Sequence, residues 1–142
     1  MTQAFLKNIA AYVDQQQALE PSASVAGAIT GGAIDTFNSG NKYTSGVLYV
    51  RAGTPTGTPT SYTVTGKLQH STASTTGWAD VTGGAISTIS GTSAAAGASI
   101  GVDLAPLNRY VRFTGTIAIT GGTTPTVPTS AEIVFAGQSV PI

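Results

Sequence analysis

Apolar and polar residues alternate one by one along three segments of the chain, 62–70, 99–104 and 111–119. Successive side chains on a β-strand point to opposite faces, so each segment predicts a strand with one buried side and one solvent-facing side. The residues predicted to face the interior are Tyr62, Val64, Leu68, His70, Ile100, Val102, Leu104, Val111, Phe113, Ile117 and Ile119.

Shorter apolar runs, separated by glycine, proline and threonine, predict further strands. They lie at 25–29, 33–37, 46–51, 79–81 with 85–89, and 132–135. About eight short strands at turn-punctuated spacing favour an all-β fold, a single β-sandwich that is jelly-roll-like. Alternating strand–helix architecture is excluded, because only the first residues have helical spacing.

The first 21 residues differ from the rest of the chain. Six apolar residues fall at spacings compatible with one helical face, and Pro21 then blocks continuation of a helix. We therefore expect a short helix or an extended arm over 1–21, followed by a sandwich domain over 22–142. This stripe can pack on its own sandwich or dock on a neighbouring subunit. Its members are Phe5, Leu6, Ile9, Ala10, Tyr12 and Val13.

Two segments are rich in Thr-Pro, namely 53–60 (GTPTGTPT) and 121–130 (GGTTPTVPTS). Repeated Thr-Pro favours extended, polyproline-like backbone. Proline cannot donate a ladder hydrogen bond, so neither segment is expected to form a central strand.

Charge is scarce: charged residues make up 8% of the chain, against about 25% in typical soluble proteins. The 6 Lys and Arg balance the 6 Asp and Glu, and the basic residues form no cluster. Binding to nucleic acid or to an anionic membrane needs clustered positive charge, so neither partner is expected.

Cysteine is absent, which excludes disulfides, thiolate nucleophiles and cysteine-based zinc sites. No apolar run approaches the roughly 18 residues that a membrane-spanning helix needs. The first residues lack the basic and apolar regions of a secretory leader. We expect a soluble protein that is not exported by a signal peptide.

Catalytic motifs are not evident, and we expect no enzyme, cofactor or metal. The single histidine, His70, has no G-x-S-x-G serine motif to accompany it, and the six carboxylates are scattered. His70 is better explained as a strand-end residue that is partly buried or caps a turn. The paired glycines fit tight turns rather than phosphate-binding loops.

Three polar or aromatic residues invite a binding role. Trp78 is best explained as a core or rim aromatic, with a sugar-stacking platform as the alternative. Arg109 and Arg112 are candidates for polar recognition or subunit pairing, although a solvated strand face explains them as well.

Three stretches together carry a resemblance to a known family. The first stretch comprises DQQQAL at 14–19, ASVAGAI at 23–29 and GAID at 32–35. The second comprises KLQHS at 67–71 and GWADV at 77–81. The third comprises DL at 103–104, RYVRF at 109–113 and AEIV at 131–134. In this order they resemble the cement, or head-decoration, proteins of tailed bacteriophages, over most of the chain after residue 14. The chain departs from that pattern at Thr36-Phe37 and at Thr75-Thr76.

The resemblance implies a jelly-roll-like sandwich that forms homotrimers on the outer surface of the phage head. There it would bridge neighbouring subunits of the major capsid protein, after synthesis in the host cytoplasm. We expect the contacts to come from the N-terminal segment and the 53–60 loop. The candidate contact residues are Phe5, Leu6, Tyr12, Thr54, Pro55, Thr58 and Pro59.

Two other functions remain open from the sequence. One is a phage tail or adhesin-type β-domain that binds host glycans through Trp78 and nearby tyrosines. The other is a small hydrolase centred on His70. A sandwich fold alone does not choose among these functions, because sandwiches host many of them.

Overall fold

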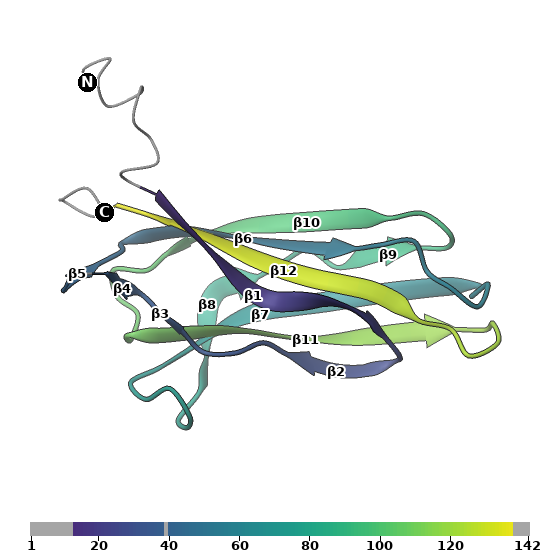
Figure 1. The fold of residues 1–142 in the computed structure, drawn as a ribbon, viewed down its shortest axis with the longest axis horizontal. Coiled ribbons are helices and arrows are strands. Elements are labelled where there is room, and N and C mark those ends of the chain that lie inside the picture. The colour runs from purple at the N-terminus through teal and green to yellow at the C-terminus, as the bar shows by residue number, and fades with distance from the viewer. Residues whose placement is uncertain (1–12, 39, 138–142) are drawn as a thin grey trace, which may run out of the picture.

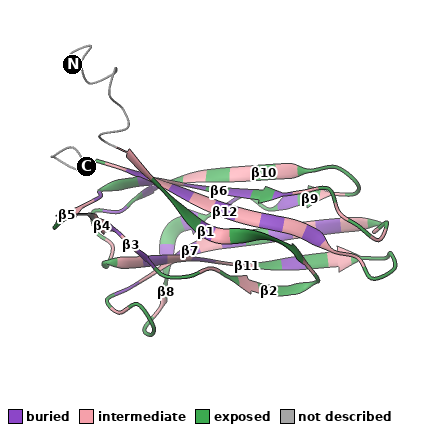
Figure 2. Ribbon diagram, in the orientation of Figure 1, coloured by how far each residue is buried: buried purple, intermediate pink, exposed green. Residues whose placement is uncertain are grey.

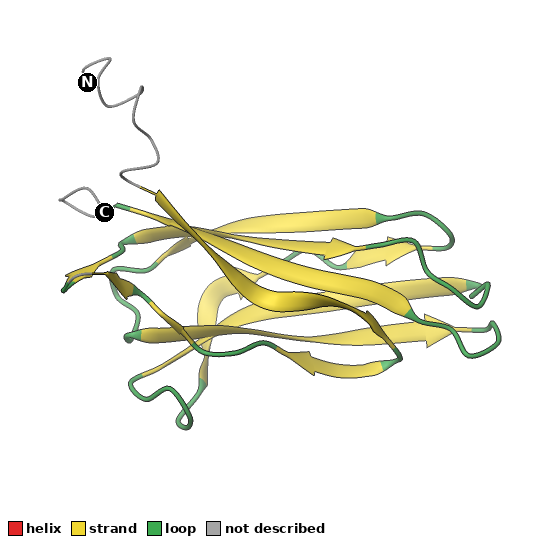
Figure 3. Cartoon of the chain, viewed as in Figure 1, coloured by secondary structure: helices red, strands yellow, loops and turns green. Residues whose placement is uncertain are grey.

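The structure is a computed structural model, which describes residues 13–38 and 40–137 (Figure 1). All regular structure in these residues is β, and no helix is present among them (Figure 3). The strands are β1 (Val13–Ser24), β2 (Gly27–Thr30), β3 (Ile34–Asp35), β4 (Phe37–Asn38), β5 (Asn41–Lys42), β6 (Ser45–Ala52), β7 (Ser61–Ser71), β8 (Ala79–Ala85), β9 (Ile89–Gly91), β10 (Ala96–Asp103), β11 (Tyr110–Thr120) and β12 (Val127–Ala136).

The long strands form two antiparallel sheets that pack face to face (Figure 1). The four-stranded sheet has the order β1-β12-β6-β10, and the six-stranded sheet has the path β2-β11-β7-β8 with β3 and β9 attached. The pairs are nested: β1 with β12, β2 with β11, β6 with β10 and β7 with β8. This is jelly-roll winding, so the predicted all-β sandwich is confirmed.

The core lies between the sheets and is built by the alternation that the sequence shows (Figure 2). Leu48 and Val50 of β6 face Val64 and Leu68 of β7, and all four are fully buried. The predicted inward residues of β11 are buried as well, except Ile119, which is half-buried. Burying apolar area removes it from water, and this is the main favourable term that holds the sheets together.

Two glycines shape the middle of the core. Gly66 of β7 pairs with Gly115 of β11, and the Phe113 ring fills the space above them. A Cβ at Gly66 would lie 2.4 Å from Phe113 Cε2, which is closer than any real contact. The absence of a side chain at Gly66 is therefore a packing requirement.

The expected N-terminal arm needs correction for its described part. Residues 13–24 form β1, which pairs with β12 along one edge of the four-stranded sheet. β1 runs through the boundary predicted at residue 21, and Pro21 lies in an irregular stretch between Leu19 and Ser22. Proline is tolerated there because β1 is an edge strand. The helix or arm expected over residues 1–12 lies outside the described residues.

The expectation that 121–130 avoids the sheet was wrong for its second half. Val127 begins β12, a central strand between β1 and β6 that includes Pro128. The ladder to β6 begins at Thr129, opposite Ala52, and beyond it the Pro128 carbonyl accepts a hydrogen bond from Gly53 N–H at 2.6 Å. Pro128 lacks the N–H that would donate a bond back to Gly53, so only this one bond is missing, at the end of the ladder.

Candidate functional site

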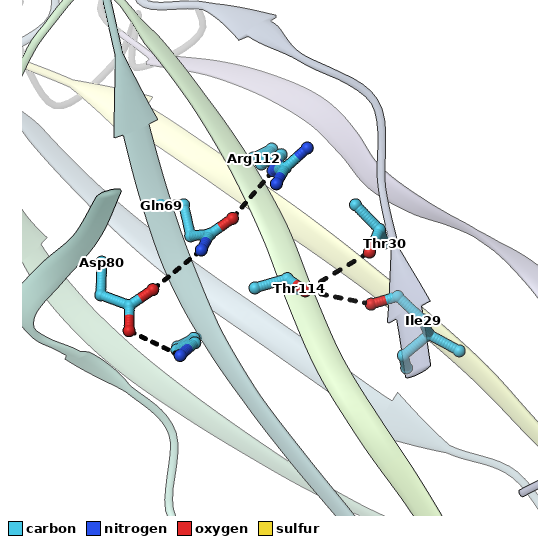
Figure 4. Close-up of polar contacts among 7 residues, drawn as sticks. Ile29, Thr30, Gln69, Asp80, Arg112 and Thr114 are labelled. Carbon is cyan, nitrogen blue, oxygen red and sulfur yellow. Dashed lines mark hydrogen bonds and ion pairs between the residues drawn. The ribbon is translucent and has the colours of Figure 1, made fainter. Parts of the chain in front are cut away.

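A row of polar side chains crosses the outer face of the six-stranded sheet (Figure 4). Lys67 Nζ lies 2.6 Å from Asp80 Oδ2, and Gln69 Nε2 donates to Asp80 Oδ1 at 2.8 Å. Arg112 Nε donates to Gln69 Oε1 at 2.9 Å. Each residue is thereby held by the next, from β8 across β7 to β11.

Strand register explains this row. Alternation turns Lys67 and Gln69 outward from β7 and Arg112 outward from β11. Arg112 pairs directly with Gln69, and Gln69 pairs directly with Asp80. Cross-strand neighbours on one face lie within side-chain reach, so the hydrogen bonds follow from the pairing.

Trp78, which directly precedes β8, contacts Arg112 at the end of the polar row. The Arg112 guanidinium carbon lies 4.5 Å from the centre of the Trp78 ring, which is cation–π geometry. The indole is half-buried, and Arg112 covers one of its faces. A sugar could therefore stack only on the other face.

The row offers no free acid or base. The hydrogen bond from the Lys67 ammonium holds the pKa of Asp80 below its usual value, and the Gln69 amide lowers that pKa further. Asp80 is thus a bound carboxylate at neutral pH, with both oxygens accepting hydrogen bonds. The row is a structured polar surface rather than a proton-transfer site.

A shallow groove of about 530 Å³ runs beside the polar row. At its β11 wall, Thr114 Oγ1 lies 3.4 Å from both the Ile29 carbonyl and Thr30 Oγ1 (Figure 4). Hydroxyl and small apolar groups dominate the lining, with Lys67 and Gln69 at the side that meets the row. The other lining residues are Ala28, Thr65, Gly66, Ala85, Ile86, Thr88, Gly115 and Thr116.

The two Thr-Pro loops meet at one end of the sandwich, and we call residues 53–60 and 121–126 the Thr-Pro tip. Thr56 and Thr126 form a bridge, with their hydroxyls 2.6 Å apart. Thr123 N–H donates to the Gly57 carbonyl at 2.9 Å, and Thr60 N–H donates to the Thr120 carbonyl at 2.8 Å. This pairing was not predicted from the sequence because the two loops are far apart along the chain, although both are rich in Thr-Pro.

The tip contains four of the seven candidate contact residues. Thr54 and Thr58 are exposed, whereas Pro55 and Pro59 are half-buried. The structure thus places the two hydroxyls where a partner can meet them, and their capsid contact stays a prediction. The other three candidates, Phe5, Leu6 and Tyr12, lie outside the described residues.

His70 occupies the end of β7, as the strand-end interpretation predicts. Its Nδ1 accepts a hydrogen bond from the Asn108 backbone N–H at 3.0 Å. The neighbouring Ser71 is buried; its hydroxyl donates to the Thr76 carbonyl and accepts from Ala73 N–H. These bonds tie both side chains to turns, and neither bonds the other as a nucleophile and its base would.

Arg109 and Asp35 form a second charged pair that sequence reasoning did not connect, because 74 positions separate them. Arg109 donates from Nε to Oδ1 at 3.0 Å and from one terminal nitrogen to Oδ2 at 2.7 Å. The bond from Arg109 lowers the pKa of Asp35, and Phe37 N–H adds to the effect. The pair joins β3 to the start of β11.

Within residues 13–38 and 40–137, no cluster of three histidine or carboxylate side chains could hold a metal ion. In the same residues, no helix is long and apolar enough to cross a membrane.

No family model and no curated protein matches the sequence. Among solved structures, the fold is similar to the PBSX exported protein XepA, with a TM-score of 0.55 at 14% identity over 92% of this chain. It is also similar to a chain of infectious bursal disease virus, Gx strain, with a TM-score of 0.50 at 12% identity over 91% of this chain. This chain spans 39% and 33% of those two chains, respectively. At these identities the similarity shows a β-sandwich fold that occurs in a viral structure.

Proposed function

We propose that this chain is a virion structural protein, a cement protein that binds the outside of an assembled phage head. Its partners would be the major capsid protein and further copies of the same chain. The observation that carries the proposal is the Thr-Pro tip, which is exposed, uncharged and locked by hydrogen bonds between its two loops. The motif resemblance and the occurrence of this fold in a viral structure support the same assignment.

The tip suits a permanent protein contact for two reasons. Its threonines and prolines can be buried without leaving a charge unpaired, which is costly in an interface. Its backbone is already ordered, because Gly57 and Gly122 adopt positive φ and pack against the opposite loop. Less conformational entropy is then lost on binding.

Stabilisation of the head would follow from mass action. A ligand that binds only the assembled shell lowers the free energy of that state relative to the ruptured one. The jelly roll supplies a rigid body for this task, since its first and last described strands are paired. No catalytic step is needed.

The test is co-sedimentation of the purified protein with expanded heads that lack it, followed by electron microscopy. We expect saturable occupancy on the outer surface. The double variant Thr54→Asp with Thr58→Asp should reduce affinity by about tenfold or more, because it places two carboxylates in an uncharged contact.

A matched control is the double variant Thr88→Asp with Thr116→Asp, which adds two carboxylates at exposed sites in the groove of the six-stranded sheet. This variant should bind as the wild type does. Failure of the wild-type protein to bind heads would refute the proposal. Binding that is lost in the Thr88→Asp, Thr116→Asp variant and kept in the tip variant would move the contact to the sheet.

The groove beside the polar row favours a second candidate, a tail or adhesin-type domain that binds host glycans. Its hydroxyl lining and the adjoining Lys67 and Gln69 can hydrogen-bond sugar hydroxyls. Glycan binding by the wild-type protein that is lost in Lys67→Ala with Gln69→Ala would support this candidate over the capsid one.

A further inference from the structure

β10 is an edge strand of the four-stranded sheet, and its outer side has no partner strand (Figure 1). β10 pairs with β6 over eight residues without a register shift. Apart from its ladder to β6, no backbone hydrogen bond is found for Ala96–Asp103 among the described residues. Half of its N–H and C=O groups therefore face outward, ready to pair with another strand.

The other edges carry features that discourage pairing. β1 contains Pro21 and two register irregularities, and β2 has only four residues. β8 is interrupted by a register shift, and β9 has three residues. β10 lacks proline and basic residues, and its only charge is Asp103 at its end. Among these edge strands, β10 is thus the one without a feature that discourages pairing.

The two ends of this edge carry opposite charges, Arg51 near one end and Asp103 at the other. Arg51 of β6 pairs with Gly97 of β10, and a Cβ at Gly97 would lie 2.8 Å from Arg51 Cδ and 3.3 Å from its Nε. The arginine side chain thus crosses Gly97 toward the open edge, and it forms no ion pair with any described residue. Asp103 is exposed at the other end of β10.

We propose that β10 pairs antiparallel with β10 of a second copy, about a two-fold axis at Ile100. In this register, Ala98 lies opposite Val102 of the second copy and Ile100 lies opposite Ile100, so apolar side chains of the inner face lie beside one another. Asp103 of the second copy then lies opposite Gly97. Neighbouring strands are about 4.8 Å apart, so this Asp103 is within reach of the Arg51 side chain that crosses Gly97. The symmetry makes two such Arg51–Asp103 pairs.

Other registers fit less well. A shift by one residue would place the inner face of one strand beside the outer face of the other. A shift by two keeps the faces but moves Asp103 away from Gly97. A strand in the proposed register also covers the groove of about 390 Å³ between β8 and β10, where Val102 lies. The zero net charge of the chain allows two copies to approach without overall repulsion.

This contact does not depend on the capsid proposal, and it differs from the three-fold contact that the family resemblance implies. Pairing of one edge with the same edge is isologous and yields a closed dimer. A three-fold assembly would have to use another surface.

The experiment measures molecular mass by sedimentation equilibrium over a concentration series of the full chain. We expect a monomer–dimer equilibrium. Arg51→Glu and Asp103→Arg should each weaken dimerisation by about tenfold, because each puts like charges in both pairs. An equimolar mixture of the two variants should form heterodimers with wild-type strength, since both pairs then join opposite charges.

The chain has no cysteine, so a disulfide reports the register. Ile100→Cys should form a disulfide-linked dimer under mild oxidation, whereas Thr116→Cys on the other sheet should not. Circular dichroism checks that every variant is folded. A monomer or a trimer at all concentrations, or no recovery in the mixture, would overturn the proposal.

Discussion

At the scale of single residues, glycine positions carry information that hydrophobic patterning does not. Gly66 and Gly115 continue the inward-facing sets of β7 and β11, yet they add no side chain to the core. The Phe113 ring takes the space that a side chain at Gly66 would fill, and a Cβ at Gly115 would lie 2.2 Å from the Thr65 carbonyl oxygen. One large aromatic and two glycines thus form a single packing unit across two strands.

This unit predicts that Gly66→Ala destabilises the fold. The added methyl group would overlap the Phe113 ring at 2.4 Å, and overpacking of this kind costs about 2 kcal/mol. Gly101→Ala is the control, because a Cβ there meets nothing within 4 Å. Urea denaturation should show a lower midpoint for Gly66→Ala alone. Equal midpoints for both variants would show that the core absorbs the methyl group.

At the scale of elements, short strands are held by polar side chains as much as by their ladders. β3 has two residues and two register pairs with β11. Asp35 adds a two-point ion pair to Arg109, whose guanidinium also lies 5.2 Å from the centre of the Phe37 ring. The Thr36 hydroxyl donates to the Arg109 carbonyl at 2.6 Å. These contacts fix a segment that has too few backbone bonds to fix itself.

The Asp35–Arg109 pair predicts a pH-dependent contribution to stability. The pKa of Asp35 is lowered in the folded state from its ordinary 3.8, so the pair stabilises the fold above about pH 4. This contribution is lost as pH falls through the lowered pKa. Asp35→Asn should reduce Tm by about 2 °C at pH 7, since both partners are partly exposed and screened by solvent.

The same difference should vanish near the acid end of the folded range, where the wild-type carboxyl is protonated. Thermal melts by circular dichroism between pH 2.5 and 7 measure it, at roughly one-unit steps. Arg109→Gln should show the same pH-dependent part because it removes the same pair, with a constant loss added for its contact with the Phe37 ring. A difference that stays constant with pH would show that the charge of the Asp35 carboxylate does not stabilise the fold, which would contradict the prediction.

At the scale of the whole molecule, nested pairing links the described ends of the chain. β1 pairs with β12, and the Thr-Pro tip joins two loops that are about 70 positions apart. Apart from the β7–β8 and β4–β5 hairpins, the strand pairs join segments far apart in the sequence, so local contacts alone cannot stabilise the sandwich. The polar row and the groove lie on one sheet, whereas the open edge of β10 belongs to the other.

This topology predicts one cooperative unfolding transition and slow folding. Fluorescence of Trp78, the single tryptophan, reports the six-stranded sheet, while far-ultraviolet circular dichroism reports both sheets. The two urea curves should coincide, and refolding should take milliseconds to seconds, as is typical of non-local β-structure. Separate transitions would show that the two sheets unfold independently.

The sequence by itself determined the class of the fold and much of its core. Alternation at 62–68 and 111–117 correctly predicted which side chains of β7 and β11 point inward, because the period of two is a local property of a strand. It failed at the end of β7, where His70 is half-buried and Ser71 is buried instead. The sequence also located the 53–60 loop and the strand-end position of His70. The alternation of apolar and polar residues was not evident at 96–98, because Ala and Gly are small, so the first part of β10 was not predicted.

Only the tertiary structure decided what depends on pairing. Proline counted against a strand at 127–130, but the β6 ladder ends before Pro128 and the residue is accommodated. The partners of Asp35, Gln69 and Thr56 lie on other strands or loops, and register alone brings them together. The open edge at β10 likewise exists only once strand order is set. Alternation follows from the geometry of one strand, whereas register, edges and grooves follow from which strands become neighbours.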